Sequence, residues 1–181
     1  YILKLKKALY GVIADSITGC IVMNANPFTL GHRYLIENAA DQVDKLIVFV
    51  VEEERSEFSF KDRLEMVKMG VSDLENVFVV PSGQFIISYK TLPVYFEKSK
   101  LKNVRLNALT DLELFTRIIA PALGIRVRFA GEEPYDMVTK QYNEQMSEQL
   151  HEFGIMFNEI PRFALNGETV SATKARRYME E

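Results

Sequence analysis

The sequence predicts an α/β fold: a doubly wound, Rossmann-like sheet of five parallel strands with helices on both faces. Short apolar runs alternate with longer segments of helical period, which is typical of repeated β-α units. One run, residues 45–51 (KLIVFVV), is apolar on both faces, as expected for a central strand between two helix layers. The chain has 181 residues, 48% of them hydrophobic, which is enough to bury the core of one such domain.

Apolar runs place the expected strands. They cover residues 19–24, 45–51, 77–80, 126–130 and 155–160, with a further short strand expected at 104–106. The stretch from Phe85 to Ile87 fits either a strand or a loop. Ligands of such sheets bind at the carboxyl ends of the strands, so the loops of interest are 24–32, 52–60, 81–92, 131–134 and 161–171.

Helical spacing fills the segments between these strands. Apolar side chains share one face over residues 35–43, and Ser59 is the expected N-cap of a helix whose apolar face reaches Leu74. Further helices are expected at 92–98, at 111–123, at 135–153 and from Ser171 onward. The alternation of these helices with the strands is what the doubly wound fold requires.

Charge and cysteine content exclude several classes of protein. The formal net charge of −3 does not favour a nucleic-acid or anionic-membrane partner. Cys20 is the only cysteine, so no disulfide can form within the chain, and a reducing, cytoplasmic setting is expected. The two histidines, His32 and His151, lack metal-ligand spacing with Cys20, and no metal site is predicted. No apolar run approaches the roughly 20 residues of a membrane span, and no signal-peptide pattern is present.

Glycine spacing excludes the two commonest nucleotide cradles. No two of the nine glycines are two positions apart, so the G-x-G-x-x-G fingerprint of dinucleotide-binding folds is missing. The phosphate-binding pattern G-x-x-x-x-G-K-[ST] is missing as well. A nucleotide bound to this domain must therefore be held by another device.

The segment 26–32 (NPFTLGH), directly after the first strand, is one such device. Pro27 fixes the backbone as it leaves the strand, and Gly31 permits close packing where the helix begins. His32 falls in the first helical turn, where unpaired N–H groups and the helix dipole favour an anion. The Thr29 hydroxyl and the His32 imidazole can converge on one phosphate. The alternative is a histidine that only caps its own helix.

The segment 170–177 (VSATKARR) is the second device. Ser171 is the expected N-cap of the last helix, and Thr173 and Arg176, three residues apart, share a helix face. Two hydroxyls, free N–H groups and a guanidinium make a second anion site. The alternative is a capped, solvated helix. Two such helix starts in one α/β chain indicate that both meet on one polyanion.

Together the two segments resemble the nucleotidyltransferase superfamily of the H-x-G-H and I-S-S-T-x-x-R type. Within it, VMNANPFTLGHRYLIENAA (22–40) is similar to the citrate lyase ligase family. Further agreement runs in order through FSFKDRLEMVK, IISYKTLP, APALGIRVRFAGEEP, VTKQYN and VSATKARR, and the resemblance covers nearly all of residues 19–177.

The resemblance implies roles for residues that match the family's motifs. Thr29 and His32 are expected to bind the ATP phosphates and stabilise the transition state at the α-phosphorus, with Thr29 in place of the usual first histidine. Ser171, Thr173 and Arg176 are expected to hold the β- and γ-phosphates. The adenosine and the turn beneath it are expected to involve Gly131, Glu132, Glu133, Asn24, Asn26 and Phe28.

Some side chains keep two interpretations. Arg55 stands near the place where many relatives carry a lysine, but Arg55 and Arg63 also fit salt-bridged surface residues. Glu132 and Glu133 also fit plain solvated acids, and Cys20 fits packing better than chemistry. Ser88, Tyr89 and Thr91 lie in a loop that can border the acid substrate.

The activity that the resemblance implies is the ATP-dependent activation of acetate. Acetyl-adenylate and pyrophosphate form, with Mg²⁺, and the acetyl group then passes to the thiol prosthetic group, a phosphoribosyl-dephospho-CoA group, on the acyl carrier subunit of citrate lyase. The family also carries an amino-terminal acetyltransferase-like domain, so residues 1–18 are expected to be a residual segment and 19–181 the catalytic domain. Alternatives are a tRNA cytidine acetate ligase-like enzyme, a generic adenylyl- or cytidylyltransferase, and a nucleotide-binding regulatory module.

Overall fold

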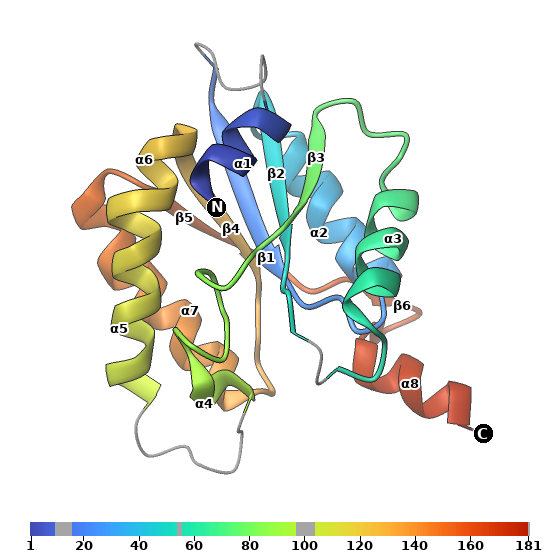
Figure 1. Ribbon diagram of the computed structural model, residues 1–181. Helices are drawn as coiled ribbons and strands as arrows, with labels where there is room; N and C mark the ends of the chain where they lie inside the picture. The colour runs from blue at the N-terminus through green and yellow to red at the C-terminus, as the bar shows by residue number, and fades with distance from the viewer. Residues whose placement is uncertain (10–15, 54–55, 97–103, 181) are drawn as a thin grey trace.

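A five-stranded parallel sheet forms the centre of the molecule (Figure 1). The computed structural model describes residues 1–9, 16–53, 56–96 and 104–180. The strand order is β3-β2-β1-β4-β5, which confirms the predicted doubly wound topology. The strands are β1 (Thr18–Met23), β2 (Lys45–Val50), β3 (Val77–Pro81), β4 (Ile125–Gly131) and β5 (Met156–Ile160).

Helices cover both faces of this sheet (Figure 1). One face packs against α2 (Leu30–Ala40) and α3 (Phe60–Gly70). The other face packs against the following elements: α1 (Ile2–Ala8), α5 (Val104–Leu114), the π-helix η2 (Phe115–Ile119), α6 (Ala120–Leu123) and α7 (Met137–Leu150). The short helix α4 (Pro93–Phe96) lies between β3 and α5, and α8 (Ala172–Glu180) ends the described chain.

Local signals explain where these elements begin and end. The Ser59 hydroxyl accepts the N–H of Asp62 at 3.2 Å, which confirms it as the N-cap of α3. Gly124 ends α6 with a φ of 66°, a left-handed conformation that glycine adopts without strain. Within β2, Leu46, Ile47, Val48, Phe49 and Val50 are all fully buried, as the doubly apolar run predicted.

Between β3 and β4, the structure overturns one expectation from the sequence and decides another that was open. The predicted strand at 104–106 is wrong, because these residues form the first turn of α5. The buried side chains Ala108, Leu112 and Phe115 recur at i, i+4 and i+7, so the helical period extends upstream of the expected helix start at Asp111. The stretch 85–87 is a loop: Ile87 has a φ of 46°, which a strand does not allow.

The remaining differences concern short elements. The predicted helix at 135–153 consists of α7 and a 3₁₀ turn, η3 (His151–Phe153). The sequence did not indicate α1, nor the hairpin of β6 (Ala164–Leu165) and β7 (Glu168–Thr169) between β5 and α8. None of the helices in the described ranges is long and apolar enough to cross a membrane.

Candidate active site

The carboxyl ends of β1 and β4 form the centre of the candidate site. The chain runs outward from β1 through β2 to β3, then crosses back to build β4 and β5 on the other side of β1. The strand order therefore reverses between β1 and β4, which is where open α/β sheets bind their ligands. The segment 26–32 follows β1 and the segment 131–133 follows β4, so both predicted groups of residues reach this point.

The turn after β1 is fixed by contacts with the start of α3. Asn26 Oδ1 accepts the N–H of Phe58 at 3.0 Å, and Asn24 Nδ2 donates to Ser56 Oγ at 3.3 Å. Ala25, between the two asparagines, has a φ of 48°, a strained conformation for a residue other than glycine. The Asn26–Pro27 peptide bond is cis. The two predicted asparagines therefore shape the turn through their side chains.

Arg63, on α3, ties the ends of β1 and β2 together. Its buried guanidinium donates to the carbonyl oxygens of Asn24 at 2.7 Å, Val51 at 2.9 Å and Glu53 at 2.5 Å. The interpretation of Arg63 as a salt-bridged surface residue is therefore wrong. The helix turns this side chain inward, where strand-end carbonyl groups and the Asn24 amide oxygen accept its hydrogen bonds. Arg55, the other arginine predicted for this loop, lies outside the described residues.

His32 completes a hydrogen-bonded cap at the start of α2. The Thr29 backbone N–H donates to His32 Nδ1 at 3.1 Å, and Thr29 Oγ1 lies 2.9 Å from the same nitrogen. The imidazole therefore occupies the position that a Glu or Gln takes in the usual capping box. His32 therefore caps its own helix, and the cap leaves Nε2 with no hydrogen bond to the described residues.

The His32 imidazole is neutral. Burial, with the nearby Arg162 charge in the same direction, lowers the pKa of His32 to about 4. Because Nδ1 accepts the Thr29 N–H, the single proton of the neutral ring sits on Nε2. The Phe28 ring stacks on the imidazole with centroids 5.8 Å apart, and Gly70 leaves room for it, since a Cβ there would lie 2.3 Å from a Phe28 ring carbon. The result is a fixed Nε2–H donor.

The two predicted anion-binding segments meet in the structure. A Cβ at Gly31 would lie 3.3 Å from the carbonyl oxygen of Val170, so the start of α2 and the segment before α8 pass in close contact. Arg176 donates through Nη1 to the carbonyl oxygen of Asn26. Its Nε forms an ion pair with Glu57 Oε2 at 3.0 Å. Two stretches about 145 residues apart in sequence therefore belong to one surface.

The start of α8 has the predicted capped geometry. Ser171 Oγ accepts the N–H of Lys174 at 3.2 Å, and Arg176 Nη2 donates to Thr173 Oγ1 at 3.3 Å. Both hydroxyls lie in the first turn, beside the free N–H groups of the helix start. The serine, the threonine and the arginine thus form one polar end of α8.

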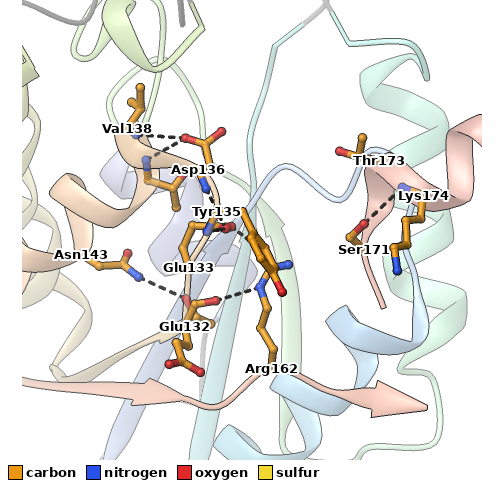
Figure 2. Close-up of polar contacts among 12 residues, drawn as sticks. Glu132, Glu133, Tyr135, Asp136, Val138, Asn143, Arg162, Ser171, Thr173 and Lys174 are labelled. Carbon is orange, nitrogen blue, oxygen red and sulfur yellow. Dashed lines mark hydrogen bonds and ion pairs between the residues drawn. The ribbon is translucent and has the colours of Figure 1, made fainter. Parts of the chain in front are cut away.

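The segment after β4 is organised by Arg162, at the carboxyl end of β5 (Figure 2). Arg162 forms an ion pair with Glu133 Oε2 at 2.5 Å and donates to the carbonyl oxygen of Glu132 at 3.0 Å. Glu133 Oε1 also accepts the N–H of Asp136, which caps α7. Glu133 is therefore an anchored residue, whereas Glu132 is exposed. Figure 2 shows the start of α8 facing this group, and no interaction is drawn between the two.

Arg162 and Asn143 are the site residues that sequence reasoning missed. Asn143 donates to the carbonyl oxygen of Gly131 at 3.1 Å and to Glu159 at 2.7 Å, which holds the end of β4. The signal for Arg162 was its place directly after the strand-ending Ile160-Pro161, inside a loop already of interest. Nothing in the spacing of Asn143 distinguishes it from other polar residues of α7.

Cys20 takes no part in this chemistry. It is fully buried in β1, and burial raises the pKa of its thiol to about 12. The packing interpretation is confirmed. Within the described residues, no group of three or more His, Cys, Asp or Glu side chains could hold a metal ion.

Solved structures show the same fold. The chain superposes on a pantoate–β-alanine ligase from Francisella tularensis with a TM-score of 0.59 and 14% identity, covering 97% of this chain and 70% of that one. At this identity the similarity establishes the fold of the sheet and its helices, and it assigns no residue.

Sequence comparison assigns the family. The profile of the citrate lyase ligase C-terminal domain matches residues 18–181. The citrate (pro-3S)-lyase ligase of Haemophilus influenzae is 44% identical over 168 residues, which are 90% of this chain and 50% of that protein. The enzyme of the same name from Escherichia coli K12 is 42% identical over 166 residues, 89% of this chain and 47% of that protein. The chain thus spans about half the length of the curated relatives it matches, and it belongs to the citrate lyase ligase family through that family's C-terminal domain.

Proposed function

We propose that this chain activates acetate with ATP and passes the acetyl group to a thiol. An acetate oxygen attacks the α-phosphorus, the bond to the bridging oxygen breaks, and pyrophosphate leaves with acetyl-adenylate as the other product. The thiol is that of the phosphoribosyl-dephospho-CoA group on the citrate lyase acyl carrier subunit, which takes up the acetyl group and releases AMP. The contact between the segments 26–32 and 170–176, at the reversal of strand order, is the observation that carries this proposal.

The triphosphate is proposed to lie between the two helix starts. His32 Nε2–H, which has no bond to the described residues, would donate to an oxygen on the α-phosphorus as negative charge builds up there. Thr29 stands beside it at the N-cap of α2. Ser171, Thr173 and Arg176 would hold the β- and γ-phosphates through hydroxyls, helix N–H groups and a guanidinium.

The adenosine is proposed to lie against the segment after β4. Gly131, Glu132 and Glu133 are held in place there by Asn143 and Arg162. Asn24, Asn26 and Phe28 would form the floor of the site from the turn after β1. Arg55 is proposed as an additional phosphate ligand, from the resemblance of its loop to the family.

The chemistry needs charge stabilisation more than a nucleophilic side chain. Acetate is already an anion, so the protein has to position it in line with the leaving pyrophosphate and compensate the charge on the phosphate oxygens. Mg²⁺ is proposed to come with the nucleotide, since it is usually held by phosphates, waters and one or two carboxylates. It would neutralise the phosphate charge during the displacement.

The wider setting is proposed from the family as well. Residues 19–181 are proposed as the nucleotidyltransferase-like catalytic domain, and Leu5 and Leu9 of the preceding segment pack into its core. A cytoplasmic location fits Cys20, a free and fully buried thiol.

Pyrophosphate release tests the proposal directly. With ATP and Mg²⁺, acetate should give pyrophosphate, and hydroxylamine should trap the acetyl group as acetohydroxamate. Phosphopantetheine, nicotinamide mononucleotide and a sugar phosphate serve as competing substrates. Release with one of these but not with acetate would indicate a generic nucleotidyltransferase, and ATP binding without release would indicate a regulatory module. Acetylation of a tRNA in preference to the carrier thiol would overturn the proposed acceptor.

A single substitution tests the role of His32. His32→Ala should lower the rate of adenylate formation by about 10²–10³, because a donor aimed at the developing charge is lost. His151→Ala is the matched control, since His151 lies in the exposed turn η3 and should leave the rate unchanged. A folded His32→Ala protein with the wild-type rate would remove His32 from the mechanism.

A further inference from the structure

Arg128 is a buried cation that lacks a complete set of partners. It lies in β4, three residues before the strand ends, and its side chain packs on the face covered by α5 and α7. The residue is 1% exposed. Its Nη2 donates to the Tyr142 hydroxyl at 3.2 Å, but its Nη1 is buried without a hydrogen-bond partner. Buried donors are almost always paired, so this one points to a missing acceptor.

The neighbouring carboxylate cannot supply that acceptor. Asp111 Oδ1 accepts the N–H of Ile87 at 2.6 Å and the Thr91 hydroxyl at 2.7 Å, and its Oδ2 accepts the Tyr142 hydroxyl at 2.6 Å. None of these bonds involves Arg128 Nη1. Asp111 therefore organises the loop 82–92 and the tyrosine, and the guanidinium keeps one free donor.

Aromatic rings limit what could meet this donor. The Phe115 ring lies under the guanidinium, with 4.4 Å between its centroid and Cζ, and the Tyr142 ring is at 5.7 Å. The face of the guanidinium is thus occupied, and only its edge remains available. A carboxylate binds arginine at this edge, and Nη1 is the donor that it would meet here.

The cluster also lies beside the proposed nucleotide site. Tyr95 of α4 packs edge-on against Tyr142, with ring centroids 6.4 Å apart, and its hydroxyl bonds to Thr139. Thr139 is in the first turn of α7, which Asp136 caps after the Glu133 segment. Gly131, three residues beyond Arg128, is about 10 Å further along β4.

We propose that Arg128, through its unpartnered Nη1, binds the carboxylate of a short monocarboxylic acid, the acid substrate of the proposed reaction. This inference rests on the proposed function. In the ligand-free structure Nη1 has no access to solvent, so the acid enters as the loop 82–92 shifts. Ile87, in that loop, is held in a strained conformation (φ 46°) by its bond to Asp111, which makes the closed arrangement dependent on these contacts.

Arg128→Lys is the primary test, because it keeps the charge and removes the planar fork. The KM for acetate should rise at least about 30-fold, while the KM for ATP stays within about twofold, as expected when one charge-assisted pair is lost. Arg126→Lys is the matched control, since Arg126 lies in the same strand with an exposed side chain. It should change neither constant.

Binding provides a second readout that does not depend on turnover. With a non-hydrolysable ATP analogue present, acetate should raise the melting temperature of the wild type and of Arg126→Lys, but not that of Arg128→Lys. If the wild type releases no pyrophosphate with acetate, the proposed function fails, and an acetate shift that requires Arg128 would still support the site. An unchanged KM and an unchanged shift in folded Arg128→Lys would overturn the site alone.

Tyr142→Phe decides the case if Arg128→Lys does not fold. This change keeps the ring and removes only the hydroxyl that orients Nη2. A rise of about fivefold in the KM for acetate would support the site, since one hydrogen bond is lost. A wild-type KM would overturn it.

Discussion

The neutral state of His32 makes a quantitative prediction about stability and pH. The folded protein holds the pKa of His32 at about 4, against an ordinary value of 6.5 in the unfolded chain. Between these two values the unfolded chain binds a proton that the folded protein does not. The contribution of His32 to the free energy of unfolding is therefore greatest above pH 6.5 and falls as the pH drops from 6.5 towards 4. Lowering the pH from 7 to 5 should cost about 2 kcal/mol through this residue alone.

His32→Gln isolates the effect. Glutamine keeps an acceptor for the Thr29 N–H, as in the usual capping box, but does not titrate. Chemical unfolding followed by circular dichroism at pH 7, 6 and 5 gives the difference between the two proteins. For a chain of this size, about 2 kcal/mol corresponds to about 4–8 °C in melting temperature. From pH 7 to pH 5, the melting temperature of the wild type should therefore fall by that much more than that of His32→Gln. Parallel curves for the two proteins would show that His32 titrates normally, and the neutral imidazole would have to be abandoned.

Three further substitutions or treatments probe the rest of the site. Arg63→Met should cost about 3–5 kcal/mol in urea unfolding, because the strand-end carbonyl oxygens lose a buried charged donor; a loss below about 1 kcal/mol would contradict that role. Gly31→Val should raise the KM for ATP by about tenfold while the protein remains folded, since a side chain there meets the carbonyl oxygen of Val170; an unaltered KM would mean that the contact is dispensable. Cys20 should react with a thiol reagent only at the rate of unfolding, because it is fully buried and its pKa is raised to about 12; rapid labelling of the native protein would count against this.

The sequence predicted the sheet well because its strands are short apolar runs, as expected for strands buried between two layers of helices. Residues 45–51 were expected to form a central strand, as observed, and the capping pattern of Ser59 placed the start of α3 correctly, although the helix ends at Gly70, before Leu74. The expected strand at 104–106 failed because three alternating residues are too few to distinguish a strand from the first turn of a helix. Nor did the composition of residues 164–169 indicate the hairpin of β6 and β7.

The sequence predicted the residues of the candidate site that lie at helix starts. It did not predict the residues that only tertiary contacts bring into the site. Thr29, His32, Ser171 and Thr173 stand at helix N-termini, which their residue types reveal. The functions of these residues stay predictions. Arg63 looked like a surface residue because several of its partners are backbone carbonyl oxygens, and these leave no trace in the sequence.

Arg128 and Asp111 show the same limit. They come together through Tyr142, and the three residues belong to separate elements, β4, α5 and α7. Only the fold brings the three side chains into one cluster.

The close contact between Gly31 and Val170 means that the candidate site is completed by a segment that follows the whole sheet in the sequence. All five strands and the helices on both faces are encoded before residue 171, so the sheet does not need α8 to be complete. In the proposed function, a chain that ends before residue 171 would lack the hydroxyls of Ser171 and Thr173 for the triphosphate. A released chain that ends at residue 170 would therefore separate folding of the sheet from binding of the nucleotide.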